Sequence, residues 1–87
     1  MAYVYILQSL VNGRYYIGST SNLERRLTEH NLGKSKYTSF TRPFVLKFSQ
    51  KFSSPTEARK VELWLKRQKD AKLTRSIIKE GKIQKEF

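Results

Sequence analysis

The chain has 87 residues, of which 18 are Lys or Arg and seven are Asp or Glu, so its formal net charge is +11. It contains no cysteine and one histidine, which excludes disulfides and thiolate-ligated zinc. No apolar run approaches the ~20 residues of a membrane span, and the N-terminal segment lacks the basic start of a signal peptide. We therefore expect one cytoplasmic domain over residues 1–87, with no membrane contact and with an anionic partner, of which nucleic acid is the commonest.

The first predicted elements are two strands, at residues 2–7 and 14–18. Both are rich in aromatic and β-branched residues, and the Asn-Gly pair between them is a strong hairpin signal. Because side chains alternate between the two faces of a strand, an even-length loop places Tyr5 and Tyr16 on the same sheet face.

A helix is predicted from about residue 22 to 31. Ser21 and Glu24 have the spacing of a capping box, so Ser21 is the expected N-cap. The outer side of this helix is an ordinary solvated face, on which Arg25 can pair with Glu29 at i+4.

The inner side of this helix carries polar groups where hydrocarbon is expected. Leu23 and Leu27 define the apolar stripe, and at roughly 100° per residue Arg26 and His30 fall within about 100° of the same arc. Taken singly, Arg26 can snorkel to solvent and His30 can be a half-buried structural histidine. Their i, i+4 spacing makes them neighbours on one helix edge, which favours a common ligand.

Residues 33–43 are basic and rich in hydroxyl groups and lack either periodicity, which predicts a loop. Residues 44–48 form a third strand candidate. Two further helices are predicted after residue 54, so the element order is β-β-α-β-α-α. This order predicts an α/β (α+β) fold in which three helices flank a small, mainly antiparallel sheet of three strands.

The second and third helices have clear start signals. Ser54 and Glu57 form a capping box with a proline at the first helical position, which opens a helix from residue 55 to about residue 68. Asp70 can cap a last helix that ends at Gly81.

The second helix repeats the anomaly of the first. Its apolar stripe contains Ala58 and Val61, and Glu62 lies on the margin, about 40° from Ala58. An unpaired carboxylate facing inward costs several kcal/mol, so Glu62 needs a cation, which is Arg26, a lysine or a metal. A structural ion pair and a Mg²⁺ ligand are both open at this point.

Two phenols, an arginine, a histidine and a carboxylate on a basic domain are the parts of phosphodiester hydrolysis. The positive surface gathers a polyanion, and the arginine stabilises phosphate charge. The carboxylate holds a metal, and a phenol or imidazole takes the proton from water. A tyrosine in a strand more often only packs, so the set carries this argument and no single residue does.

These residues lie in a pattern that resembles the GIY-YIG nuclease domain. It is closest to small stand-alone bacterial proteins related to the N-terminal nuclease domain of the excision-repair subunit UvrC. The first motif appears as YVY at residues 3–5 and the second as YIG at 16–18, followed by STSNLERRLTEHN, KYT, RPF and SSPTEARKVELWLKRQ. The resemblance covers nearly the whole chain.

The resemblance implies a role for each inward polar residue. Tyr5 would be the general base or would position the water, and Tyr16 would contact the scissile phosphate or order the water. Arg26 would stabilise the phosphate, and His30 would assist proton transfer. Glu62 would hold a single Mg²⁺ or Mn²⁺, and the floor of the site would be the sheet face that bears both tyrosines.

The chain departs from the family pattern at two positions. Tyr3 stands where the first motif has glycine, and Ser19 stands where the repair-subunit branch often has a lysine. The second change removes one expected phosphate contact. Neither change touches the expected base or metal ligand.

Backbone contacts to nucleic acid are expected from the basic loop and from the second helix. The candidate residues are Lys34, Lys36, Tyr37, Thr38, Arg42 and Lys66. Because the sequence has no recognition helix or zinc module, we expect low sequence specificity and a protein partner that supplies it.

The sequence therefore favours a metal-dependent DNA endonuclease of low sequence specificity, structure-selective and acting in DNA repair or recombination. The alternative is a non-catalytic nucleic-acid-binding module with the same fold. Both hypotheses predict salt-sensitive binding, and they differ at Glu62, which only the nuclease requires. A basic protein-interaction domain would explain the charge but not the inward-facing polar residues.

Overall fold

The computed structural model describes residues 1–33 and 42–83. Its strands are β1 (Ala2–Ser9), β2 (Tyr15–Thr20) and β3 (Phe44–Phe52). Its helices are α1 (Leu23–Asn31), α2 (Pro55–Gln68) and α3 (Ala71–Glu80). The strands form one antiparallel sheet in the order β2-β1-β3, which confirms the predicted α+β fold and its element order.

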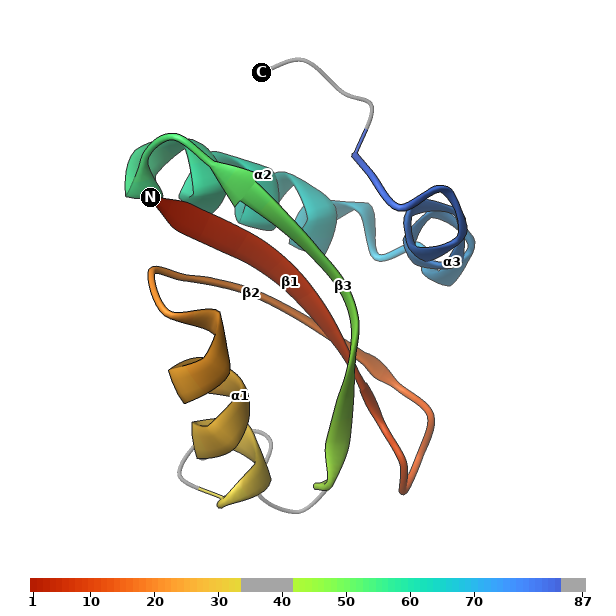
Figure 1. Ribbon diagram of the computed structural model, residues 1–87. Coiled ribbons are helices and arrows are strands. Elements are labelled where there is room, and N and C mark those ends of the chain that lie inside the picture. The colour runs from red at the N-terminus through yellow and green to blue at the C-terminus, as the bar shows by residue number, and fades with distance from the viewer. Residues whose placement is uncertain (34–41, 84–87) are drawn as a thin grey trace.

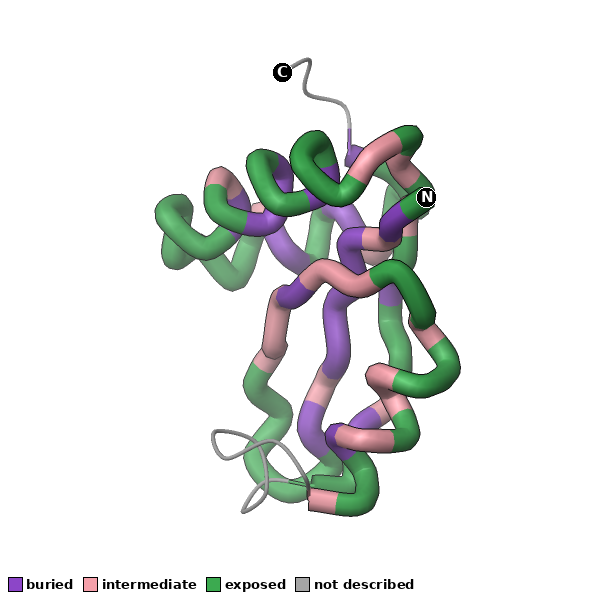
Figure 2. Tube along the Cα trace, turned by 90° about the vertical axis from the view of Figure 1, so that its left-hand side faces the viewer, coloured by how far each residue is buried: buried purple, intermediate pink, exposed green. Residues whose placement is uncertain are grey.

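Helices cover both faces of this sheet (Figure 1). On one face, Val4 and Ile6 of the central strand pack with residues of α2 and α3. On the other face, Tyr5 and Leu7 pack with Phe44 and with the two leucines of α1. Residues alternate between these clusters because successive strand side chains point to opposite faces. The central strand β1 is therefore buried along most of its length (Figure 2).

The β1–β2 hairpin has the expected register. Tyr5 pairs with Gly18, and Leu7 pairs with Tyr16, so the two tyrosines share one sheet face as predicted. Gly13 takes a φ of +74° in the turn, a conformation that glycine adopts at little cost. Both strands end two residues later than predicted, and β2 begins one residue later.

Gly18 lets the Tyr5 side chain lie across β2. A Cβ atom added at Gly18 would collide with the hydroxyl and ring of Tyr5. The phenol therefore occupies the space that a side chain at position 18 would fill, and it reaches the free edge of β2 because of that. The glycine of the YIG motif is thus explained by this close approach of the Tyr5 ring to the backbone.

Replacing Gly18 by alanine is expected to lower the free energy of unfolding by about 1–3 kcal/mol, because the added methyl group overpacks the Tyr5 ring. Urea unfolding measures this loss. A double-mutant cycle with Tyr5→Leu checks the cause, since the two costs should be strongly non-additive if the contact is responsible. Simple additivity would show that the loss arises elsewhere.

The start of α1 corrects the sequence prediction. Asn22 is the N-cap, and its side chain accepts a hydrogen bond from the backbone N–H of Arg25; Ser21 is not the cap. The chain leaves β2 through a turn in which the Thr20 hydroxyl accepts from the Asn22 N–H, and this turn delays the helix by one residue. Gly33 follows the helix with a φ of +77°, a left-handed conformation that is typical of the glycine after a helix C-cap.

The caps of α2 and α3 lie where they were predicted. Ser54 accepts from the Glu57 N–H, and Asp70 accepts from two backbone N–H groups at the start of α3. Gly81 ends α3 with a φ of +79°. Strand β3, by contrast, continues beyond the predicted residue 48, because it pairs along β1 as far as Ala2 and its outer positions are exposed polar residues typical of an edge strand.

Candidate active site

A groove of about 950 Å³ runs along the free edge of β2. Its walls come from both sheet faces, because it is lined by residues of β1, β2 and all three helices. All five predicted catalytic residues line it, namely Tyr5, Tyr16, Arg26, His30 and Glu62. The structure therefore gathers the whole predicted set into one continuous surface.

The five residues reach the groove from opposite sides of the sheet. Tyr5 and Tyr16 share the face covered by α1. Glu62 belongs to α2 on the other face, where it accepts a hydrogen bond from Ser19. The prediction that the sheet face bearing both tyrosines forms the whole floor of the site is therefore wrong, because Glu62 comes from the opposite face. The groups meet at the edge because β2 has no outer neighbour in the described sheet and because Gly18 leaves room for the Tyr5 phenol.

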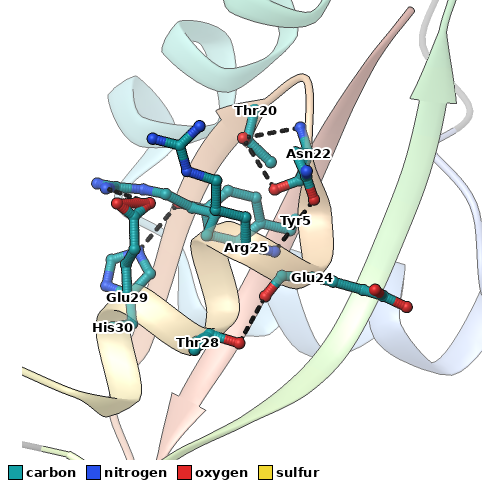
Figure 3. A network of polar contacts seen from close by, with 9 residues as sticks. Tyr5, Thr20, Asn22, Glu24, Arg25, Thr28, Glu29 and His30 are labelled. Atoms are coloured by element: carbon teal, nitrogen blue, oxygen red, sulfur yellow. Dashed lines mark hydrogen bonds and ion pairs between the residues drawn. The ribbon is translucent and has the colours of Figure 1, made fainter.

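Tyr5 and His30 form a buried polar pair (Figure 3). The Tyr5 Oη atom lies 3.1 Å from His30 Nε2, and the two residues are 4% and 5% exposed. Burial raises the pKa of the Tyr5 phenol, although the nearby Arg26 guanidinium opposes this shift. The phenol is therefore neutral at pH 7 and needs a partner to accept its proton.

His30 is suited to accept that proton. Burial lowers the pKa of His30, and the positive charge of Arg26 lowers it further, so the neutral imidazole is favoured at pH 7. With its own proton on Nδ1, a neutral His30 accepts from the Tyr5 hydroxyl at Nε2. The ring also contacts Phe44 edge-on, with centroids 6.0 Å apart, which helps to fix its orientation.

Arg26 is half-buried at the rim of the groove. Its Nη1 atom lies 3.8 Å from Glu29 Oε1. The predicted partner of Glu29 was Arg25, so that prediction is wrong in the described structure. Arg25 is exposed, whereas Arg26 and Glu29 are both half-buried and lie about one helical turn apart, at i and i+3. This loose pair leaves the guanidinium facing the groove.

Acid is expected to weaken the fold through His30 before any other group acts. The pKa of folded His30 lies below 6.5, so as the pH falls through this value the unfolded chain binds a proton that the folded chain resists. Stability should therefore fall between pH 7 and 5. His30→Gln should be less stable at pH 7 but show a shallower fall of Tm. Because the chain has one histidine, equal slopes in the two proteins would contradict this account.

Glu62 is 3% exposed and bound by three donors. Its Oε1 atom accepts from Ser19 and, at 3.1 Å, from Arg59, and its Oε2 atom accepts from Lys66 at 2.6 Å. Burial raises the pKa of Glu62, but the bonds from Lys66, Ser19 and Arg59 outweigh it and leave the pKa below its usual value. The carboxylate is therefore ionised at neutral pH. A lysine is its partner, as one of the predicted options had it, and Arg26 is not.

The donor set fits a magnesium-type ion better than zinc. The described residues contain no group of three or more His, Cys, Asp or Glu side chains that could enclose a metal. Mg²⁺ is commonly held by one or two carboxylates, with water and substrate phosphate completing its shell. Glu62 supplies one ionised carboxylate at the groove. The Arg59 and Lys66 side chains that cover it are 61% and 48% exposed, so both can move into solvent.

The predicted nucleic-acid contacts are only partly described. Lys34, Lys36, Tyr37 and Thr38 lie outside the described residues. Arg42 donates from Nη1 to the Leu32 carbonyl at the end of α1, at 3.2 Å. Lys66 lines the groove but binds Glu62, so it is the lysine that was one of the predicted partners of that carboxylate.

Of the two cations that bind Glu62, Arg59 was not predicted, and Lys66 was predicted only as a nucleic-acid contact. Arg59 and Lys66 stand three residues before and four residues after Glu62, and this helical spacing was a usable signal for both pairs. Ser19 was noted only as a departure from the family pattern, and its bond to Glu62 joins residues 43 positions apart. Local periodicity holds no information about such a contact.

Comparison with known proteins shows the family of the chain. The model of the GIY-YIG catalytic domain matches residues 1–75, and the chain belongs to this family. The fold is therefore that of a GIY-YIG domain, a nuclease class that acts on nucleic acid and typically uses divalent metal ions. No helix in the described parts of the chain is long and apolar enough to cross a membrane.

Relatives that match this chain include small proteins named UPF0213. One from Streptococcus pneumoniae is 46% identical over 69 residues, which are 78% of this chain and 69% of that protein. One from Staphylococcus haemolyticus is 45% identical over 65 residues, which are 74% of this chain and 78% of that protein. The solution NMR structure of UPF0213 protein BH0048 from Bacillus halodurans has a TM-score of 0.57 and 35% identity, over 93% of this chain and 87% of that one.

Proposed function

We propose that this protein is a metal-dependent endonuclease that hydrolyses phosphodiester bonds of DNA with low sequence specificity and selects its substrates by structure. One observation carries the proposal. The Tyr5–His30 pair approaches the groove from one sheet face and Glu62 approaches it from the opposite face, and they meet at the β2 edge. A proton acceptor and an ionised carboxylate thus lie on one basic surface.

The Tyr5–His30 pair is the proposed base. A water molecule that attacks phosphorus must lose a proton, and the Tyr5 hydroxyl can take it as its own proton passes to neutral His30 across the 3.1 Å contact. The low pKa of His30 keeps it ready for this step at pH 7. Burial of both side chains excludes bulk water from the transfer.

Arg26 and Tyr16 are the proposed phosphate contacts. The Arg26 guanidinium can stabilise the charge that develops on the phosphoryl oxygens. The Tyr16 ring packs edge-on against Phe44, with centroids 5.2 Å apart, which holds it in place beside the groove. Glu62 is the proposed ligand of Mg²⁺ or Mn²⁺, and Ser19 orients its carboxylate. When bound, the ion supplies Lewis-acid stabilisation of the phosphoryl and leaving oxygens.

The family and the charge support further proposals about specificity, partners and cellular role. A single domain over residues 1–87 with a net charge of +11 can hold a sugar–phosphate backbone, and its described parts, residues 1–33 and 42–83, contain no element suited to reading bases. We therefore propose that a protein partner supplies specificity, and that the protein acts in the cytoplasm in DNA repair or recombination.

The test is cleavage of labelled duplex, flap and branched DNA by the purified full chain with Mg²⁺ or Mn²⁺ and with EDTA as control. We expect metal-dependent nicking that does not depend on sequence and is faster on one of the branched substrates. Cleavage that persists in EDTA would contradict the metal requirement. Cleavage confined to one sequence would contradict the proposed specificity.

A non-catalytic nucleic-acid-binding module is the second candidate. It is favoured by the two cations that already neutralise Glu62, since a carboxylate with this role needs no metal. Tight, salt-sensitive binding of DNA without cleavage of any substrate with either metal would support this candidate and reject the nuclease.

A further inference from the structure

The groove extends beyond the proposed reaction centre, and its far end has no part in the chemistry. Past Glu62 it is lined by Arg14, just before β2, by Lys69, just after α2, and by Arg75 on α3. We call these three residues the far arm.

The far arm offers positive charge that no described residue neutralises. All three side chains belong to exposed residues, and within residues 1–33 and 42–83 none of them forms an ion pair. Besides Glu62, the groove has one acidic lining residue among those described, Asp70, which accepts from two backbone N–H groups as the N-cap of α3. The charges of the far arm therefore remain available to an anion that lies in the groove.

The distance from the reaction centre follows from two elements independently. Arg14 stands four residues before Gly18, which is ~13 Å at ~3.3 Å per strand residue. Lys69 stands seven residues after Glu62, which is ~10 Å at 1.5 Å per helical residue. At ~3.4 Å of rise per nucleotide of a stacked strand, both paths correspond to three or four nucleotides.

We propose that the far arm is a second binding site for the sugar–phosphate backbone, which holds a nucleic-acid strand about three to four nucleotides away from the bond that is cleaved. This inference rests on the proposed function, because it takes the edge of β2 beside Tyr5 and Glu62 as the position of the scissile phosphate. Phosphate contacts carry no sequence information. The far arm therefore supplies affinity and strand register and leaves sequence specificity low.

Binding of fluorescein-labelled single-stranded DNA to the full chain in EDTA tests the inference without any cleavage. The variant is Arg14→Ala with Arg75→Ala. The matched control is Lys47→Ala with Lys79→Ala, two exposed lysines that do not line the groove. Both double variants lose two positive charges. Circular dichroism and Tm confirm folding of each, and the single variants Arg14→Gln and Arg75→Gln repeat the test with milder changes.

The expected result for a ten-nucleotide strand is a loss of affinity of roughly tenfold in the far-arm variant. The slope of log affinity against log salt should become shallower by about 1.4, because each lost phosphate contact contributes ~0.7 for a single strand. Each single variant should show about half of this change in slope. The lysine control should keep the slope of the wild-type protein.

Strand length locates the site. The wild-type protein and the far-arm variant should bind a dinucleotide equally, and the difference should open at about five or six nucleotides. A difference already present with the dinucleotide, or a far-arm variant that behaves like the lysine control at every length, would overturn the inference. Absence of cleavage by the wild-type protein would reject the proposed function but leave this binding result standing. Normal cleavage by the wild-type protein, together with far-arm binding equal to that of the lysine control, would support the proposed function and reject the far arm as a binding site.

Discussion

Replacing Glu62 by glutamine is expected to lower metal-dependent cleavage by about a thousandfold or more while the protein stays folded. The loss follows from the proposed metal ligand, since a bound ion contributes several kcal/mol to stabilisation of the transition state and ~1.36 kcal/mol corresponds to a tenfold change in rate. The fold should tolerate the change. Arg59 and Lys66 are largely exposed and can return to solvent, so the cost in stability should stay below about 1 kcal/mol.

The control for Glu62→Gln is Glu57→Gln, which removes an exposed carboxylate from the first turn of the same helix. It should leave cleavage unchanged. Binding of uncleaved DNA should be equal or tighter in Glu62→Gln, because one negative charge leaves the groove. If Glu62 served only as a structural partner of Lys66 and Arg59, the substitution would lower Tm and spare cleavage, and that pattern would contradict the account.

Replacing Tyr5 by phenylalanine is the second large effect. We expect cleavage to fall by about 10²–10⁴-fold, the range for loss of a general base, because the Tyr5 hydroxyl is the group that joins the groove to His30. The ring remains in the core, so the loss of stability should be about 1 kcal/mol, the cost of one hydrogen bond. Single-turnover cleavage under saturating DNA separates this loss from any change in binding.

Tyr3→Phe is the matched control for Tyr5→Phe. Tyr3 stands two residues earlier on the same strand face and does not line the groove, so removal of its hydroxyl should leave the rate unchanged. The same variant probes the position at which the first motif has lost its glycine. Equal rates for wild-type protein and Tyr5→Phe would exclude the phenol as the base and leave His30 to act on water directly.

Most of the fold was predictable because its signals are local. The Asn-Gly turn sets the register of β1 and β2, and Ser54 and Asp70 mark helix starts through caps that involve only the next few residues. One failure has a local cause and another has a non-local one. Ser21 and Asn22 are both good N-caps, and the turn at Thr20 decides between them. The length of β3 is decided by pairing with β1, which its own polar outer residues do not reveal.

The five catalytic candidates were visible in the sequence, but the other partners of Glu62 and the construction of the site were not. A residue on the wrong side of a helical wheel is visible in sequence, which is how Arg26, His30 and Glu62 were found. The wheel does not say which sheet face each helix covers, so the approach of Glu62 from the face opposite Tyr5 was not foreseen. Nor does it reveal that Ser19 reaches Glu62, because that contact depends on how α2 packs against β2.

The most direct test of the central claim, a divalent ion held by Glu62 at the edge of β2, is a titration of ¹⁵N-labelled protein with Mn²⁺ followed by NMR. Paramagnetic broadening should be strongest for the amides around Glu62 and Ser19, should weaken along the groove, and should vanish in Glu62→Gln. Broadening centred on another part of the molecule, or broadening around Glu62 that persists in Glu62→Gln, would contradict the account.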